Sequence, residues 1–177
     1  MKALSVKQPW AQLLASGIKD IENRTWRTNY RGWVLIHASQ KPVPDGWKAL
    51  SFEQTDVLTK LREKKKLPKG FSFREVRFSS IIGVTKLVDC VQNHPSVWAE
   101  HGEGIWHWVF AEARLFANPI PNVNGRLGFW DFDGWDIEDR HCDECDFFCE
   151  CGNIGHNGYD KACADFCEDV MKTLENE

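Results

Sequence analysis

The feature that most constrains the fold is a series of short apolar runs separated by turns that contain glycine and proline. WVLIHAS (33–39), SSIIGVTKLVDCV (79–91) and WHWVFAEARLFA (106–117) are rich in β-branched and aromatic residues, which favours strands. IENRTW (21–26) and RLGFWDF (126–132) are predicted to be shorter strands. About five short mixed strands with such turns favour a small β-barrel over a layered α/β fold.

Two other segments are predicted to be helical. Residues 9–16, PWAQLLAS, place three apolar side chains on one helical face, and Gly17 provides the C-terminal exit. Residues 45–66 form a second, more polar helical segment, which LPKG at 67–70 ends. We therefore expect an α+β, mainly β, fold: a barrel over 1–135 with flanking helices and a helical insertion at about 42–70.

The charge is divided unevenly along the chain, whose net charge is −4. Residues 1–130 hold 19 Lys and Arg against 11 Asp and Glu, and residues 131–177 hold 3 against 15. A basic body indicates a surface for nucleic acid, although two merely solvated faces explain the same numbers. No apolar run reaches the ~20 residues of a membrane span, and the N-terminus lacks a signal-peptide core, which predicts a cytoplasmic protein without a membrane partner.

The acidic tail, residues 136–177, contains six of the seven cysteines, between 142 and 167. Thiolates two to four residues apart can turn onto one tetrahedral zinc ion. The spacing predicts a first Zn²⁺ site and a possible second one, while a redox-active or disulfide-bonded tail is the alternative. The predicted ligands are Cys142, Cys145, Cys163 and Cys167 for the first site, and Cys149, Cys151, His156 and His141 for the second.

The segment GIKDIENR, residues 17–24, carries the pattern Gly-x-Lys-x-x-Glu-x-Arg at Gly17, Lys19, Glu22 and Arg24. With the preceding QPWA, the following RTNYRG and IHAS, and the later PIPNVNGRLGFW, it resembles the ASCH (activating signal cointegrator homology) domain family over residues 3–132. The resemblance implies a PUA-like β-barrel with a cleft beside this signature, and binding of nucleic acid, with RNA or a modified base favoured.

The residue types of the signature suit such a ligand. Lys19 is a compact cation for a phosphate oxygen, and Arg24 offers a planar fork for a phosphate or a base edge. Glu22 could accept hydrogen bonds from a base amino group, orient Lys19 or act as a general base. The structural alternative is an intramolecular Glu22–Arg24 pair at the barrel rim, with Lys19 in solvent.

Other candidates for nucleic-acid contacts lie around the signature. Trp26 sits among polar neighbours and is the best stacking candidate, whereas Trp10 and Trp33 are expected to be core residues. Cations nearby would extend a track for a phosphate backbone. The remaining predicted contacts are Gln8, Arg27, Arg31 and Lys41.

Three functions stay open at this point. A binding module is favoured, because Glu22 stands where the family's amidohydrolase-like members carry a threonine. A small hydrolase acting on a nucleoside or phosphodiester, with Lys19 and Glu22 as catalytic acid and base, is the second, and ribonuclease activity has been proposed within the family. An adaptor that is recruited by a protein partner through the tail is the third.

Overall fold

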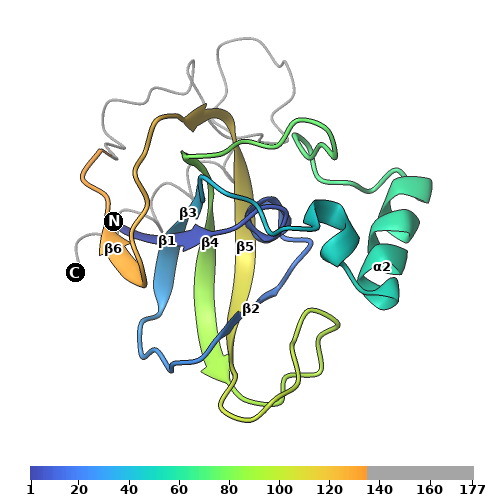
Figure 1. Cartoon of the computed structure of the whole chain (residues 1–177), viewed down its shortest axis with the longest axis horizontal. Coiled ribbons are helices and arrows are strands. Elements are labelled where there is room, and N and C mark those ends of the chain that lie inside the picture. The colour runs from blue at the N-terminus through green and yellow to red at the C-terminus, as the bar shows by residue number, and fades with distance from the viewer. Residues whose placement is uncertain (135–177) are drawn as a thin grey trace, which may run out of the picture.

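The computed structural model describes residues 1–134, which form a six-stranded sheet with few helices (Figure 1). The strand order is β2-β5-β4-β3-β1-β6, and every pairing is antiparallel except that of β1 with β3. The sheet curls into a half-barrel. This confirms the expectation of a mainly β fold and is consistent with the PUA-like architecture. The strands are β1 (Lys2–Val6), β2 (Ile21–Arg24), β3 (Gly32–Ala38), β4 (Ser80–Val91), β5 (Trp106–Ile120) and β6 (Phe129–Asp131).

Register irregularities on the two long strands explain the curl. The β4–β5 ladder shifts register at three places, and the β3–β4 ladder shifts once, at Ile36/His37. Each extra residue in a ladder bends the strand and increases its twist. β5 also continues to Ile120, three residues beyond the predicted strand.

Strand β1 was not among the predicted strands. Its five residues, KALSV, form a short run, and it lies between β3, which it pairs with in parallel, and β6. Both partners are distant in sequence, at 32–38 and 129–131. Its strand conformation therefore depends on long-range pairing that no local pattern reports.

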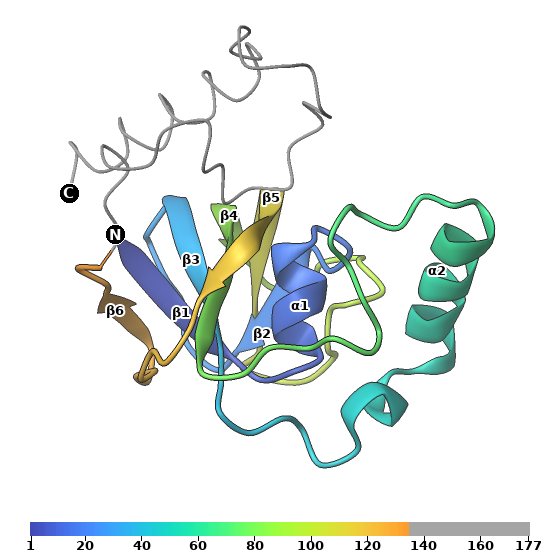
Figure 2. The ribbon, with the colours of Figure 1, turned by 90° about the horizontal axis from the view of Figure 1, so that it is seen from above.

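Helix α1 (Trp10–Ala15) packs against β1, β3, β4 and β5 on the concave side of the sheet (Figure 2). Its residues Ala11, Leu14 and Ala15 enter the main core with side chains of β1, β3 and β5. Leu13, on another face of the helix, packs with Ile21 and Trp98 in a smaller cluster. α1 therefore anchors both the barrel and the segment that follows it.

The insertion contains the short 3-10 helix η1 (Gly46–Ala49) and helix α2 (Phe52–Glu63), which stands outermost in Figure 2. Ser51 and Gln54 form a capping box at the start of α2. Leu58 is the one buried residue of α2, and it joins the small cluster of Leu13 and Ile21. The insertion is thus attached to the barrel beside β2.

The two edges of the sheet, β2 and β6, are held together by aromatic side chains. No ladder of hydrogen bonds joins β2 to β1 or β6 within residues 1–134, so we call this gap the seam. Trp108 is fully buried and stacks on Phe129 at 4.8 Å between ring centroids. Trp26 meets Trp108 edge-on at 4.5 Å, and the Trp108 indole N–H donates to the Trp26 carbonyl oxygen at 3.2 Å.

Candidate functional site

The signature begins with a reversal of the chain after α1. Gly17 has a φ of +73°, in the left-handed region that favours glycine. The backbone N–H of Lys19 then donates to the Leu13 carbonyl oxygen at 3.0 Å. This turn places Lys19 beside β2, where only 4% of the residue is exposed.

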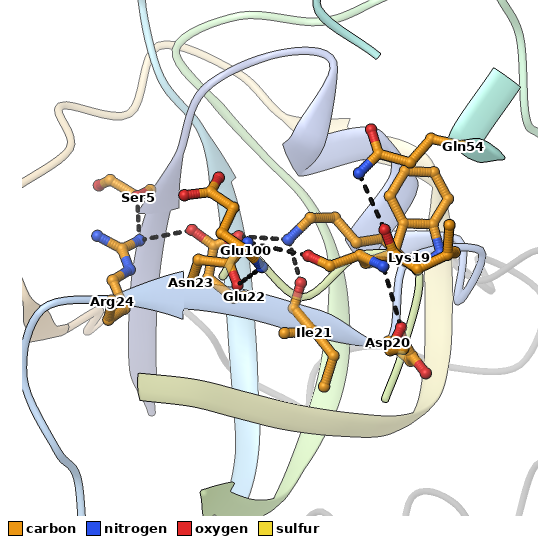
Figure 3. Close-up of polar contacts among 12 residues, drawn as sticks. Ser5, Lys19, Asp20, Ile21, Glu22, Asn23, Arg24, Gln54 and Glu100 are labelled. Carbon is orange, nitrogen blue, oxygen red and sulfur yellow. Dashed lines mark hydrogen bonds and ion pairs between the residues drawn. The ribbon is translucent and has the colours of Figure 1, made fainter. Parts of the chain in front are cut away.

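Lys19, Glu22 and Arg24 form a continuous row of polar contacts (Figure 3). The Lys19 Nζ donates to the Ile21 carbonyl oxygen and, at 2.9 Å, to Glu22 Oε2. Glu22 Oε1 lies 3.2 Å from Arg24 Nη2. Glu22 is therefore held between two cations. An ammonium has three donors, so Lys19 keeps one for an acceptor outside these contacts.

Arg24 extends the row across the seam. Its Nη2 donates to the Ser5 carbonyl oxygen on β1 at 3.2 Å, and its guanidinium lies 5.9 Å from the centroid of the Trp108 ring. Its Nε is a buried donor with no acceptor among the described residues. A buried donor without a protein partner is uncommon in folded proteins.

A cleft, which we call the signature cleft, opens beside Lys19 and Glu22, and the space within it and at its mouth is about 330 Å³. Asn23 fixes its far wall, because its side chain donates to the Trp98 carbonyl oxygen and accepts from the Glu100 N–H, each at 3.0 Å. Trp10 and Trp98 meet edge-on at 6.4 Å. The cleft is lined by Trp10, Lys19, Glu22, Asn23, Gln54, Trp98 and Glu100.

Five of these lining residues were missed as site residues by sequence reasoning. Trp10 was expected to be core and is half-buried, with part of its ring on the cleft. Asn23 could have been predicted as a site residue, because it lies inside the signature between Glu22 and Arg24. The other three, Gln54, Trp98 and Glu100, come from distant segments and left no signal in the local pattern.

The charges of the cleft are one cation, Lys19, and two carboxylates, Glu22 and Glu100. Within the described residues the lining is therefore net negative by one. A phosphate would be repelled by these carboxylates. A neutral ring with amino groups finds two carboxylate acceptors, one ammonium donor and one aromatic wall, Trp10, which the buried Trp98 backs.

Comparison with known proteins identifies the family. A family model described as the ASCH domain matches residues 4–120. This chain belongs to the ASCH domain family. Its relatives include activating signal cointegrator 1 of Homo sapiens, 34% identical over 95 residues, and of Mus musculus, 33% identical over 95 residues. Each alignment covers 50% of this chain and 14% of the relative, so the chain spans a small part of these relatives' length.

The other predicted nucleic-acid contacts of this ASCH domain lie in different surroundings. Trp26 is 39% exposed at the seam, and Arg27 is exposed with its guanidinium 5.7 Å from the Trp106 ring. Arg31 pairs with Asp89 at 2.9 Å. Lys41 is exposed on the loop after β3. None of these four residues lines the signature cleft.

Gln8 has a structural position in this ASCH domain. It is 2% exposed, its amide nitrogen donates to the Arg77 carbonyl oxygen at 2.9 Å, and its amide oxygen accepts from the Gln12 N–H at 3.1 Å. Both ends of the side chain are thus occupied within the protein. Trp33, expected in the core, is fully buried there.

The predicted zinc ligands, at 141–167, and the tail itself lie outside the described residues. Within residues 1–134 the structure contains no group of three or more His, Cys, Asp and Glu side chains placed to hold a metal ion. Cys90, the one cysteine of this part, is buried and free. No helix of residues 1–134 is long and apolar enough to span a membrane.

Proposed function

We propose that this ASCH domain binds single-stranded RNA and holds one unpaired base in the signature cleft. The proposal rests on the family, whose members are generally thought to bind RNA, and on one observation above all. That observation is the lining of the cleft, in which two tryptophans accompany two carboxylates, two amides and a single ammonium group.

The polar groups of the cleft suit a base more than a phosphate. Glu22 and Glu100 can accept from exocyclic amino groups, and the remaining donor of Lys19 can reach a ring nitrogen or a carbonyl oxygen. The half-buried ring of Trp10, backed edge-on by the buried Trp98, gives an apolar wall for the base. Lys19 then acts inside the cleft and is not a contact for the phosphate backbone.

The backbone of the RNA would follow the exposed cations outside the cleft. The guanidinium of Arg27 lies 5.7 Å from the Trp106 ring, and the neighbouring residue in the chain, Trp26, is half-exposed at the seam, so the two offer a charge and a stacking surface. Lys41 adds a second exposed cation. Because these contacts release counterions, affinity should fall as salt concentration rises.

Trp10→Leu is the test of the cleft. Leucine keeps an apolar side chain at the start of α1 but removes the ring, and loss of base stacking of ~1–3 kcal/mol weakens binding about 5- to 150-fold. Fluorescence anisotropy with a labelled single-stranded RNA measures this. Trp47→Leu is the matched control, since Trp47 packs on Phe71 and Phe73 outside the cleft and should keep wild-type affinity. Equal affinities for the Trp10 variant and wild type would contradict the proposal.

A hydrolase that uses Lys19 and Glu22 as acid and base is the second candidate, and the 2.9 Å contact between them is what favours it. Against it, both oxygens of Glu22 already contact cations, Oε2 that of Lys19 and Oε1 that of Arg24. Product release from a nucleoside or oligonucleotide that is lost in both Lys19→Ala and Glu22→Gln would favour the enzyme over the binding module.

We further propose that residues 136–177 bind one or two zinc ions and offer an acidic surface to a protein partner. The proposal rests on the cysteine spacing and on the folding free energy that a metal supplies to a segment with few aliphatic residues.

Elemental analysis of the protein, purified without added zinc, is expected to find one or two zinc ions per chain. Joint replacement of Cys142 and Cys145 by serine should remove one of them. Cys90→Ser is the matched control and should leave the zinc content unchanged, because this buried cysteine lies in the barrel. Metal-free wild-type protein would contradict the zinc assignment.

A further inference from the structure

A second cavity, open to solvent, lies between the end of β3, the start of β4 and the loop 121–128, and the space within it and at its mouth is about 820 Å³. It shares no lining residue with the signature cleft. Because its base is formed by Ser5 and His37, we call it the serine–histidine cavity. The proposed RNA-binding function assigns no role to it.

Ser5 and His37 form a fixed floor. His37 is 2% exposed, and burial lowers its pKa, which keeps the imidazole neutral. Its Nε2 lies 2.9 Å from the Val123 carbonyl oxygen and must donate to it, so Nδ1 accepts from the Ser5 hydroxyl at 3.1 Å. The Trp130 indole N–H donates to Ser5 Oγ at 3.2 Å. The donors of this floor are therefore already used.

The loop 121–128 lies directly on this floor. A Cβ at Gly125 would come within 2.4 Å of His37 Cε1 and 2.6 Å of Ser5 Oγ, so only glycine permits the approach. The Val123 N–H donates to the Ser79 carbonyl oxygen at 2.8 Å, and Ser79 has a φ of +47°, which is strained for serine. Backbone strain of this kind concentrates at functional positions.

Four polar side chains that line the cavity have no partner within the described residues. The side chains of Ser39, Ser79, Asn124 and Arg126 make no hydrogen bond or ion pair within residues 1–134. No carboxylate lines the cavity. Its charge is therefore +1, from Arg126, which is the reverse of the signature cleft.

One carboxylate near Arg126 already has a cationic partner. Asp131 on β6 has a lowered pKa, chiefly because of Lys2 and to a lesser extent because of Arg126. The Lys2 ammonium holds it at 2.7 Å. The guanidinium of Arg126 thus remains available to an anion from outside.

We propose that the serine–histidine cavity binds the phosphate group of a phosphate monoester. The planar fork of Arg126 matches two phosphate oxygens, and the hydroxyls of Ser39 and Ser79 and the amide of Asn124 supply neutral donors. The phosphate can belong to a free nucleotide or to the end of an RNA strand. Both present the same terminal group to Arg126.

Inorganic phosphate is the first probe, because it contains no base and leaves the signature cleft untouched. In nuclear magnetic resonance titrations of the full chain, the amides of 37–40 and 122–127 are expected to shift saturably, with a Kd in the millimolar range or below. Arg126→Gln should weaken binding about tenfold or more, since a charged hydrogen bond is lost. Arg74→Gln, which removes an exposed arginine of the insertion, is the matched control and should bind as wild type.

Three results would overturn the proposal of a phosphate site. Phosphate shifts that do not saturate, that lie elsewhere, or that persist in Arg126→Gln at wild-type affinity would refute the site.

Oligonucleotides then separate the two sources of the phosphate group, a free ester and a strand end. A 5′- or 3′-phosphorylated RNA that binds tighter than its hydroxyl counterpart, with the advantage lost in Arg126→Gln, assigns the phosphate to a strand end. Equal binding of phosphorylated and unphosphorylated RNA, with inorganic phosphate still bound, assigns it to a free ester. The RNA proposal can fail without affecting the phosphate result.

Discussion

Replacing Trp108 with alanine is expected to lower the free energy of unfolding by ~3–5 kcal/mol, the range for a large aromatic removed from a packed core. Trp108 is fully buried and joins the two edges of the curled sheet. It stacks on Phe129 of β6, meets Trp26 edge-on and donates its indole N–H to the Trp26 carbonyl. Alanine would leave a cavity at the seam and remove the ring beneath Arg24.

Trp26→Ala is the matched control, because it belongs to the same aromatic cluster but is 39% exposed. Less apolar surface returns to water on unfolding, so the loss of stability should be clearly smaller. Urea unfolding followed by circular dichroism compares both variants without depending on the fluorescence of nine tryptophans. If Trp108→Ala costs no more than Trp26→Ala, the seam is held by other contacts.

The parts of the fold that were predictable are those whose sequence pattern is local. β3, β4 and β5 follow from mainly apolar runs, and α1 follows from its apolar face and Gly17. β1 could not be predicted in this way, because its five residues become a strand only by pairing with β3 and β6, which are distant in sequence. Long-range pairing decided its conformation.

The candidate site was likewise predictable only where its residues lie close together in the sequence. Sequence alone identified Lys19, Glu22 and Arg24 and the proximity of an acid to a base. It did not show that Lys19 is buried, because that depends on the turn after α1 and on the packing of β2 above it. Trp98 and Glu100 reach the cleft from a loop about seventy-five residues away, held by Asn23.

Because Lys19 is buried, removing only one partner of its ion pair with Glu22 is expected to be costly, which leads to a second expected result. Glu22→Gln is expected to lower the free energy of unfolding by ~3–5 kcal/mol, as when one partner of a buried pair is removed, and Lys19→Met by less, because Glu22 keeps Arg24. The Lys19→Met variant would leave Glu22 with Arg24 as its one cation. The Glu22→Gln variant would leave the 4%-exposed ammonium of Lys19 without a counter-charge.

The double variant Lys19→Met/Glu22→Gln should be more stable than the sum of the single losses implies, because it leaves no buried charge of this pair without a partner. Urea unfolding of all four proteins measures the coupling. The exposed Lys60–Asp56 pair on α2 is the control and should show little coupling, since solvent screens it. Additive losses at Lys19 and Glu22 would mean that they act independently. Strong coupling would mean that the signature lysine and glutamate are one structural unit, so RNA binding by either single variant must be compared at temperatures where both remain folded.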